Sequence, residues 1–119
     1  MAGYLSFSPS MTGGTVGLTA AVVMTSGAPS AGSATIAAAQ GTNALLVVNA
    51  SSLVAFVRVC TTSGLTATAS DVPVQPFNGG GGHIFAMPNN TATYVYAVPI
   101  ATLSANANVY FTPGQGGVF

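Results

Sequence analysis

Few side chains in this sequence could transfer a proton, attack an electrophile or bind a metal ion. Arg58 and Asp71 are its only permanently charged residues, and it has one histidine, His83, and one cysteine, Cys60. General acid–base catalysis and metal binding require several ionisable or soft groups gathered at one place. We therefore predict that the protein is not an enzyme and that it has no cofactor, no metal site and no small-molecule substrate.

Asp71 and Arg58 can both be explained by structural roles. Asp side chains often hydrogen-bond to nearby main-chain groups, so Asp71, two residues before Pro73, is predicted to close a turn. Three interpretations of Arg58 stay open. Its stem lies along apolar surface while the guanidinium reaches solvent, or it forms a structural ion pair with Asp71, or it contacts another subunit.

His83 follows four consecutive glycines, Gly79–Gly82, and begins an apolar run. We expect His83 to be exposed at the end of a strand, and the alternative is a metal ligand shared between subunits around a symmetry axis. The glycines lack the Lys and the Ser or Thr that complete a phosphate-binding loop, and they precede a strand instead of a helix. We interpret them as a mobile or close-packed loop.

The near absence of charge indicates how the protein meets other molecules. Charged residues make up 2% of the chain and the net charge is zero, whereas ordinary soluble domains carry roughly a quarter. Copies of such a chain do not repel one another, and its surface consists of hydroxyl, amide and apolar groups. Nucleic-acid binding requires several Lys and Arg residues. We predict a structural protein that packs against other proteins and binds no nucleic acid.

Short β-branched runs alternate with clusters of Gly, Pro, Asn and Ser, which is typical of an all-β sandwich or barrel. We predict a single β-sandwich, similar to a jelly roll, of about eight short strands. The predicted strands are Gly17–Met24, Ser33–Ala38, Ala44–Val48, Val54–Cys60, Leu65–Thr68, His83–Met87, Thr93–Val98 and Ala107–Thr112. A short helix over Ala34–Gln40 is the weaker alternative there, because seven uncapped residues nucleate a helix poorly.

The pattern divides the chain into an extended N-terminal arm (1–16), a β-sandwich domain (17–112) and a C-terminal tail (113–119). Large apolar residues stand among Ser, Pro and Gly in both end segments, so we expect each segment to gain order by lying on a partner. Between Thr93 and Val98, Tyr94 and Tyr96 alternate with apolar residues. Both faces of this strand are therefore expected to be covered, one of them by a neighbouring subunit.

Signals for export and for membrane insertion are not evident in the sequence. The first residues lack a basic region followed by an apolar run, and no apolar run reaches the length of a spanning helix. We expect no export by a signal peptide and no membrane partner. Two glycosylation triplets, Asn49-Ala50-Ser51 and Asn89-Asn90-Thr91, are interpreted as chance occurrences in a chain rich in Asn, Ser and Thr.

Three stretches of the sequence are similar to parts of a known class of proteins. They are Val48–Val59 (VNASSLVAFVRV), Thr66–Val74 (TATASDVPV) and Tyr110–Gly116 (YFTPGQG). Together they resemble the small virion structural proteins encoded among the head genes of tailed bacteriophages. The resemblance covers about Leu45–Gly116 and leaves Met1–Ala39 outside it.

The resemblance implies a capsid decoration protein, or cement protein. Such a protein binds the major capsid protein at capsomer junctions, commonly as a homotrimer, on the exterior of the virion, after synthesis in the host cytoplasm. The residues expected to contact the capsid or another subunit are Tyr4, Leu5, Phe7, Met11, Tyr94, Tyr96, Val118 and Phe119. The principal alternative is a head–tail adaptor, tail or head-fibre component of the same particle. A bacterial surface subunit and a carbohydrate-binding module with sugar-stacking tyrosines are further alternatives.

Overall fold

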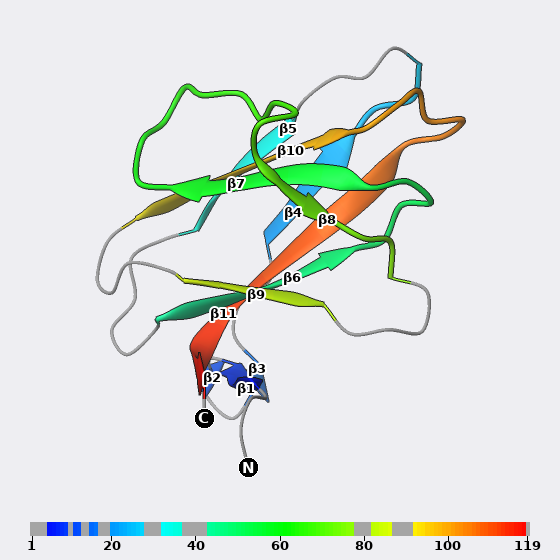
Figure 1. The fold of residues 1–119 in the computed structure, drawn as a ribbon. Helices are drawn as coiled ribbons and strands as arrows, with labels where there is room; N and C mark the ends of the chain where they lie inside the picture. The colour runs from blue at the N-terminus through cyan, green and yellow to red at the C-terminus, as the bar shows by residue number, and fades with distance from the viewer. Residues whose placement is uncertain are drawn as a thin grey trace.

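Two antiparallel β-sheets stacked face to face form the body of the protein in a computed structural model (Figure 1). The structure describes residues 5–9, 11–12, 15–16, 20–27, 32–36, 43–77, 82–86 and 92–118. For residues 5–16 and 116–118 it describes the main chain only.

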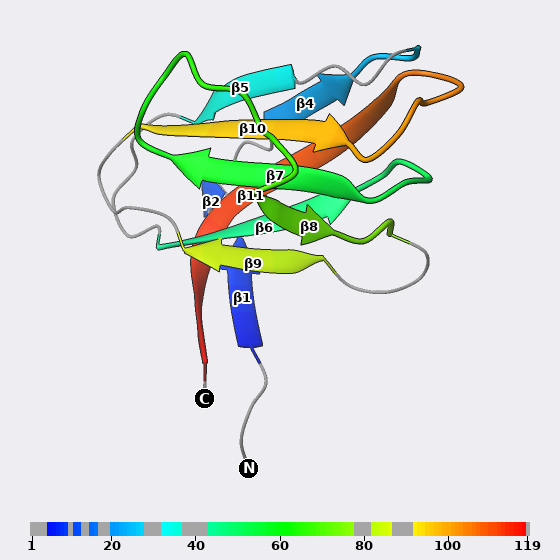
Figure 2. The same ribbon diagram turned by 45° about the horizontal axis from the view of Figure 1, so that its top comes forward.

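Eight strands, β4 to β11, build the sandwich, and Figures 1 and 2 show their arrangement in two layers. The first sheet has the order β4 (Ala20–Met24), β11 (Ala107–Val118), β6 (Ala44–Asn49) and β9 (His83–Ala86). The second sheet has the order β5 (Gly32–Ile36), β10 (Thr93–Pro99), β7 (Ala55–Cys60) and β8 (Val72–Val74).

The pairing of these strands follows one rule. From β4 to β11, the first strand pairs with the last, the second with the seventh, the third with the sixth and the fourth with the fifth. The chain therefore runs as one long antiparallel hairpin, closed between β7 and β8, that wraps into two sheets. This is the strand order of a jelly roll. The prediction of an all-β sandwich is confirmed.

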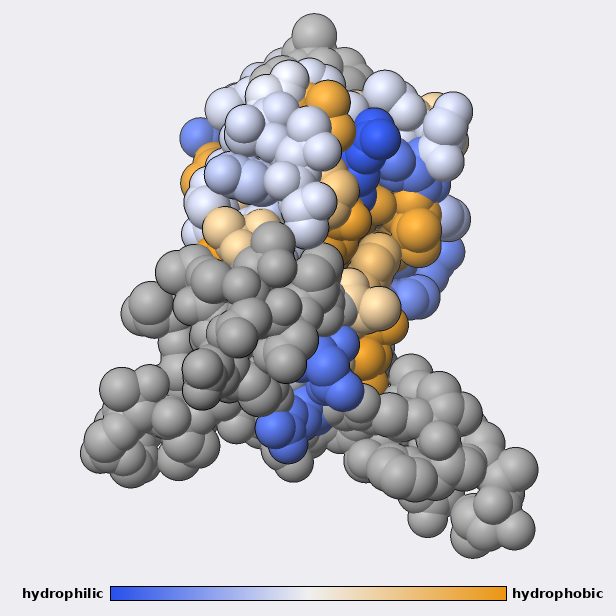
Figure 3. Space-filling model, turned by 90° about the vertical axis from the view of Figure 1, so that its left-hand side faces the viewer, coloured by the Kyte–Doolittle hydropathy of each residue, from blue (hydrophilic) through white to orange (hydrophobic). Residues whose placement is uncertain are grey.

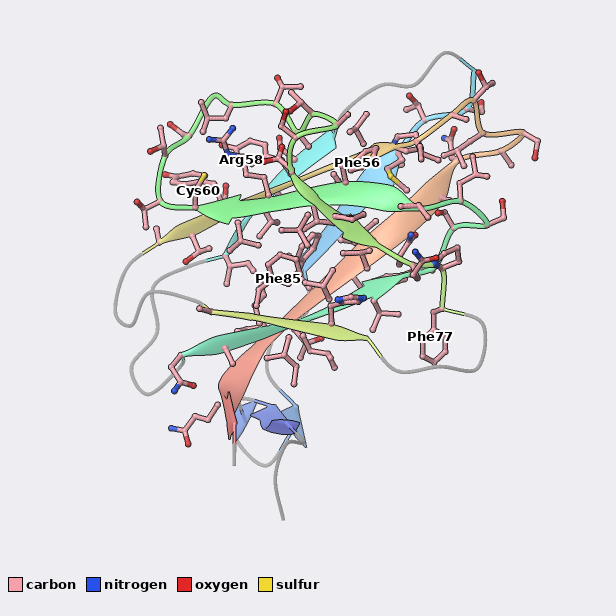
Figure 4. All side chains as sticks on the ribbon, viewed as in Figure 1. Phe56, Arg58, Cys60, Phe77 and Phe85 are labelled. Atoms are coloured by element: carbon pink, nitrogen blue, oxygen red, sulfur yellow. The ribbon has the colours of Figure 1, made fainter. Side chains whose placement is uncertain are left out.

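The core lies between the two sheets and consists of small and medium-sized apolar side chains. Alternate residues of each strand face inward, as the period of two requires. Phe111, Met24 and Leu45 are its largest members. Phe85 of β9 packs against this cluster and points between the sheets (Figure 4). The full cluster is Val22, Met24, Ile36, Leu45, Val47, Ala55, Val57, Val74, Val95, Ala97, Leu103, Val109 and Phe111.

Each predicted strand except Leu65–Thr68 overlaps a strand of the structure. The prediction of a strand at Leu65–Thr68 is wrong. The burial of these residues alternates, but they lie in a loop. The strand on this side of the sheet is β8, which the prediction missed because Pro73 stands in its centre. Pro is tolerated there because β8 is an edge strand, where a missing N–H breaks no ladder. The alternative of a helix at Ala34–Gln40 is wrong for Ala34–Ile36, which belong to β5. Residues 37–40 lie outside the described residues.

The two end segments of the chain pair with each other. The strand predicted to end at Thr112 continues to Val118, and β1 (Leu5–Pro9) pairs antiparallel with Gly114–Val118. Two further short strands, β2 (Met11–Thr12) and β3 (Thr15–Val16), pair with one another. Both chain ends lie at the same end of the molecule (Figure 1). No helix among the described residues is long and apolar enough to cross a membrane.

Candidate functional site

The outer face of the second sheet carries the only arginine of the chain between aromatic residues. On β7, Phe56, Arg58 and Cys60 alternate with buried Ala55 and Val57, so the first three face away from the core. Figure 4 shows Arg58 on the side of β7 opposite to the sandwich interior. The register places Arg58 opposite Tyr96 and Cys60 opposite Tyr94. Arg58 is exposed, whereas Phe56 and Cys60 are half-buried.

Tyr96 lies on this outer face and is nevertheless only 2% exposed. Its hydroxyl donates a hydrogen bond to the carbonyl oxygen of Thr62 at 2.6 Å and accepts one from the Leu65 N–H at 3.4 Å. The loop 61–71 between β7 and β8 therefore folds back over the sheet and buries Tyr96. A neighbouring subunit was expected to cover this strand. The protein's own loop covers Tyr96 instead, and Tyr94 is half-buried.

Asp71 closes the end of this loop. Its Oδ2 accepts a hydrogen bond from the Thr68 N–H at 2.8 Å, and its own N–H donates to the Thr68 carbonyl at 3.0 Å. The carboxylate thus bonds back to the start of the turn and not forward towards Pro73. The Asp71 carboxylate thus has its hydrogen-bond partner within the loop and requires none outside it.

The predicted ion pair between Arg58 and Asp71 is not formed in the structure, which contains no ion pair among the residues it describes. The physical reason is solvation: Arg58 is exposed, so water can hydrate its guanidinium and no countercharge is required. The solvent-reaching alternative for Arg58 agrees with this placement. A contact with another subunit stays a prediction.

His83 stands at the start of β9, is exposed, and is paired with Val47. In the described part of the chain, no three His, Cys, Asp or Glu residues lie close enough together to hold a metal ion. Ligation of a metal between subunits at His83 stays a prediction. Cys60 is half-buried and unpaired with another cysteine, and its thiol donates to the Thr62 carbonyl at 3.4 Å.

The outer face of the first sheet is a neutral surface with several apolar side chains. Its register aligns Ala21, Tyr110 and Val48 in one row and Thr112, Leu46 and Ile84 in the next. Tyr110 is 38% exposed and its hydroxyl accepts a hydrogen bond from the Asn108 amide at 3.0 Å. Val23, opposite Asn108, is 48% exposed. None of these residues carries a charge, so this face can contact only partners that accept apolar and neutral polar surface.

Apolar side chains also reach the surface elsewhere. Figure 3 shows apolar patches on one side of the molecule, between weakly and strongly hydrophilic residues. Phe77 at 51% and Ile100 at 54% are further exposed apolar residues, and Figure 4 shows Phe77 apart from the core, near the end of β6. Single exposed apolar residues are ordinary, but here almost no charge accompanies them.

A buried polar cluster fixes one end of the sandwich. Asn49, 1% exposed, donates from its amide to the carbonyls of Leu53 at 2.8 Å and Val74 at 3.0 Å. Its Oδ1 accepts from the N–H and the hydroxyl of Ser51 at 3.0 and 2.7 Å. Asn49 thereby joins the end of β6, the turn after it and β8. Its amide is inaccessible in the folded state, so the first glycosylation triplet is a structural motif. The second lies outside the described residues.

The structure places the predicted contact residues in three locations. Leu5 and Phe7 lie in β1, opposite Val118 and Gly116, and Met11 lies in β2. Tyr94 and Tyr96 lie on the outer face of the second sheet. Tyr4 and Phe119 lie outside the described residues.

Tyr110, one of the tyrosines that the sequence suggested as exposed sugar-stacking residues, is exposed, whereas sequence reasoning missed Val23. Val109 and Phe111 face inward, so the alternation of the strand places Tyr110 on the outer face. In chemical terms the described surface offers neutral hydrogen bonding and apolar contact. In comparisons with known proteins, no protein-family model, no curated protein and no solved structure matches this chain.

Proposed function

We propose that the protein is a virion structural protein that binds the outer surface of a bacteriophage capsid at capsomer junctions and stabilises the shell. The observation that carries the proposal is a jelly roll whose two outer sheet faces, over the described residues, bear Arg58 as their single charged side chain. Jelly rolls are recurrent folds of viral shells. The resemblance of Leu45–Gly116 to phage virion proteins points in the same direction.

A neutral surface suits a subunit that stays bound once it is assembled. Each neutral hydrogen bond contributes only about 1 kcal/mol net, so affinity has to come from the number of contacts made at once. A homotrimer on a symmetric capsid site multiplies every contact by three and gains from effective concentration. The partner is then the major capsid protein, and the protein resides on the capsid exterior after synthesis in the host cytoplasm.

The experiment that tests this proposal is the copy number of the protein in purified particles, measured by quantitative mass spectrometry. A cement protein is expected in hundreds of copies for each particle, and the recombinant protein is expected to have a trimeric mass in solution. A dozen copies or fewer would place the protein at a head–tail junction, in the tail or in fibres. Absence from particles would overturn the proposal.

One observation favours a carbohydrate-binding function as the second candidate. Tyr110 presents an exposed ring whose hydroxyl is held by Asn108, and jelly rolls also occur in lectins. Aromatic rings of this kind stack on sugars, and the amide can hydrogen-bond to a sugar hydroxyl. Binding to a glycan array that is lost in Tyr110→Ala and retained in Tyr94→Ala would support this candidate. The absence of any glycan signal for the unmodified protein would remove it.

A further inference from the structure

Among the described residues, the two most exposed large apolar side chains are attached to one short connection. Ile100 is 54% exposed and Phe77 is 51% exposed. The connection is the segment 50–54, which joins β6 to β7. The main-chain N–H of Ile100 donates a hydrogen bond to the Val54 carbonyl at 2.9 Å, and that of Phe77 donates to the Asn49 carbonyl at 2.7 Å. Ile100 and Phe77 are therefore held at the two ends of this connection.

The buried polar cluster fixes the main chain of the connection. The Asn49 amide donates to the carbonyls of Leu53 at 2.8 Å and Val74 at 3.0 Å, and the Leu53 N–H donates to the Ser51 hydroxyl at 3.3 Å. Exposed side chains on a main chain that is already ordered cost less conformational entropy when a partner covers them. Loops held in this way by a rigid scaffold are common sites of binding.

These residues lie at the same side of the sandwich. The register aligns Pro99, Ala55 and Val74 in one row across the second sheet, and the connection precedes Ala55 while Ile100 follows Pro99. Figures 1 and 2 both show β6, β8 and β10 ending on this side, the right-hand side of each view. Ser52, the middle residue of the connection, is exposed there. The surface thus places a hydroxyl group on the connection that holds the two apolar side chains.

The small size of this surface indicates the kind of partner that it fits. Two half-exposed apolar side chains present roughly 200 Å², whereas each partner of a stable one-to-one complex buries roughly 800 Å². One such surface is therefore too small to hold a single molecule, a free second copy included. A homotrimer presents the surface three times to a symmetric partner, and simultaneous contacts gain from effective concentration. A shell that repeats one binding site satisfies this condition.

We infer that the connection 50–54, together with Ile100 and Phe77, is the surface that docks onto an uncharged site of the capsid shell protein. This inference rests on the proposed function and names the residues that make the contact. Apolar groups of the shell cover the two exposed side chains, and neutral polar groups meet Ser52. A charge of the shell at this place would lose its hydration without gaining a countercharge, because none of these residues is charged.

Removal of the two apolar side chains tests this inference. Ile100→Ser with Phe77→Ser is expected to lower binding to particles assembled without this protein at least about tenfold, because the apolar contact is lost in every copy. Val23→Ser is the matched control: Val23 is 48% exposed on the outer face of the first sheet, and binding should fall less than about threefold. All three side chains are exposed, so thermal unfolding of both variants should stay as in the unmodified protein.

A second variant keeps both apolar side chains and adds a charge to the connection that holds them. Ser52→Arg is expected to lower binding at least about tenfold, because the guanidinium would be buried without a countercharge. Ser63→Arg, at an exposed position of the loop 61–71, is its control and should bind as the unmodified protein does.

Normal binding by both the double serine variant and Ser52→Arg would overturn the inference while leaving the proposed function intact. A change in the mass in solution caused by either variant would assign this surface to contacts between copies of the chain, and would also overturn the inference. Failure of the unmodified protein to bind particles would instead refute the proposed function.

Discussion

The Tyr96 hydroxyl donates a hydrogen bond of 2.6 Å to the carbonyl oxygen of Thr62 and thereby holds the loop 61–71 over the outer face of its own sheet. The two residues lie 34 positions apart in the chain. The loop buries the Tyr96 side chain, which points away from the core. It also adds a small layer of packing to the outer face of the second sheet. The loop, and not a second subunit, is what Tyr96 meets.

Replacement of Tyr96 by Phe is expected to loosen this loop without unfolding the sandwich. The ring remains, but the Thr62 carbonyl and the Leu65 N–H lose their common partner, which costs about 1–2 kcal/mol in the free energy of unfolding. Thermal unfolding measures the loss, and limited proteolysis is expected to cut the loop sooner. Tyr94→Phe, on the same face, is the control and should change neither. Equal proteolysis of both variants would contradict the role of the hydroxyl.

Asn49→Ala is expected to be among the most destabilising polar substitutions in the chain. It removes a buried amide that satisfies the Leu53 and Val74 carbonyls and the Ser51 N–H, at a cost of about 3 kcal/mol. Denaturation with urea measures the change. Asn108→Ala, which removes a half-exposed amide, is the matched control and should cost below about 1 kcal/mol. Similar costs for the two variants would argue against a buried polar cluster.

Gly32→Ala tests the closeness of β4 and β5 at one side of the sandwich. A Cβ at Gly32 would overlap the main-chain carbonyl of Val23 and crowd a methyl group of Val22. The strands must then separate, which is expected to cost about 1–3 kcal/mol in stability. Ser33→Ala, at the next and exposed position, should change stability by about 0.5 kcal/mol or less. A fully stable Gly32→Ala protein would show that β4 and β5 lie further apart.

Arg58 and Asp71 are expected to act independently in a double-mutant cycle. Asp71→Ala opens the turn at Thr68 and should cost about 1 kcal/mol, whereas exposed Arg58→Gln should cost about 0.5 kcal/mol or less. Since the two side chains are unpaired in the structure, the double variant should equal the sum of the single ones within about 0.5 kcal/mol. A larger coupling energy, measured by chemical denaturation, would restore the ion pair predicted from the sequence.

Occupancy of the capsid by this protein is expected to depend weakly on salt. An interface made by neutral groups has no counterions to release and no long-range attraction to screen. Between about 0.05 and 0.5 M sodium chloride, the amount bound to particles should change by less than about threefold. Co-sedimentation with particles measures it. A steep loss at high salt would mean that Arg58 or Asp71 supplies most of the affinity.

Local patterns in the sequence were sufficient to locate most of the strands. Ala44–Asn49 begins with five consecutive apolar residues, Ala107–Phe111 alternates, and Gly, Pro and Asn clusters separate the predicted strands. The errors arose where burial did not come from sheet pairing. Leu65–Thr68 has alternating burial although it lies in a loop, because Ala67 is buried there, and β8 was missed because of Pro73, which an edge strand accommodates.

The amino-acid sequence by itself determined the all-β class, the positions of the strands and the neutral character of the surface, since these follow from residue types and from neighbours two positions apart. Only the tertiary structure decided which strands pair, that β1 pairs with the chain's own C-terminal residues, and that the protein's own loop covers Tyr96. These features join residues that are far apart in sequence, such as Ser8 and Gln115. Every strand offers the same main-chain donors and acceptors. The local sequence of a strand therefore does not specify which distant strand it pairs with.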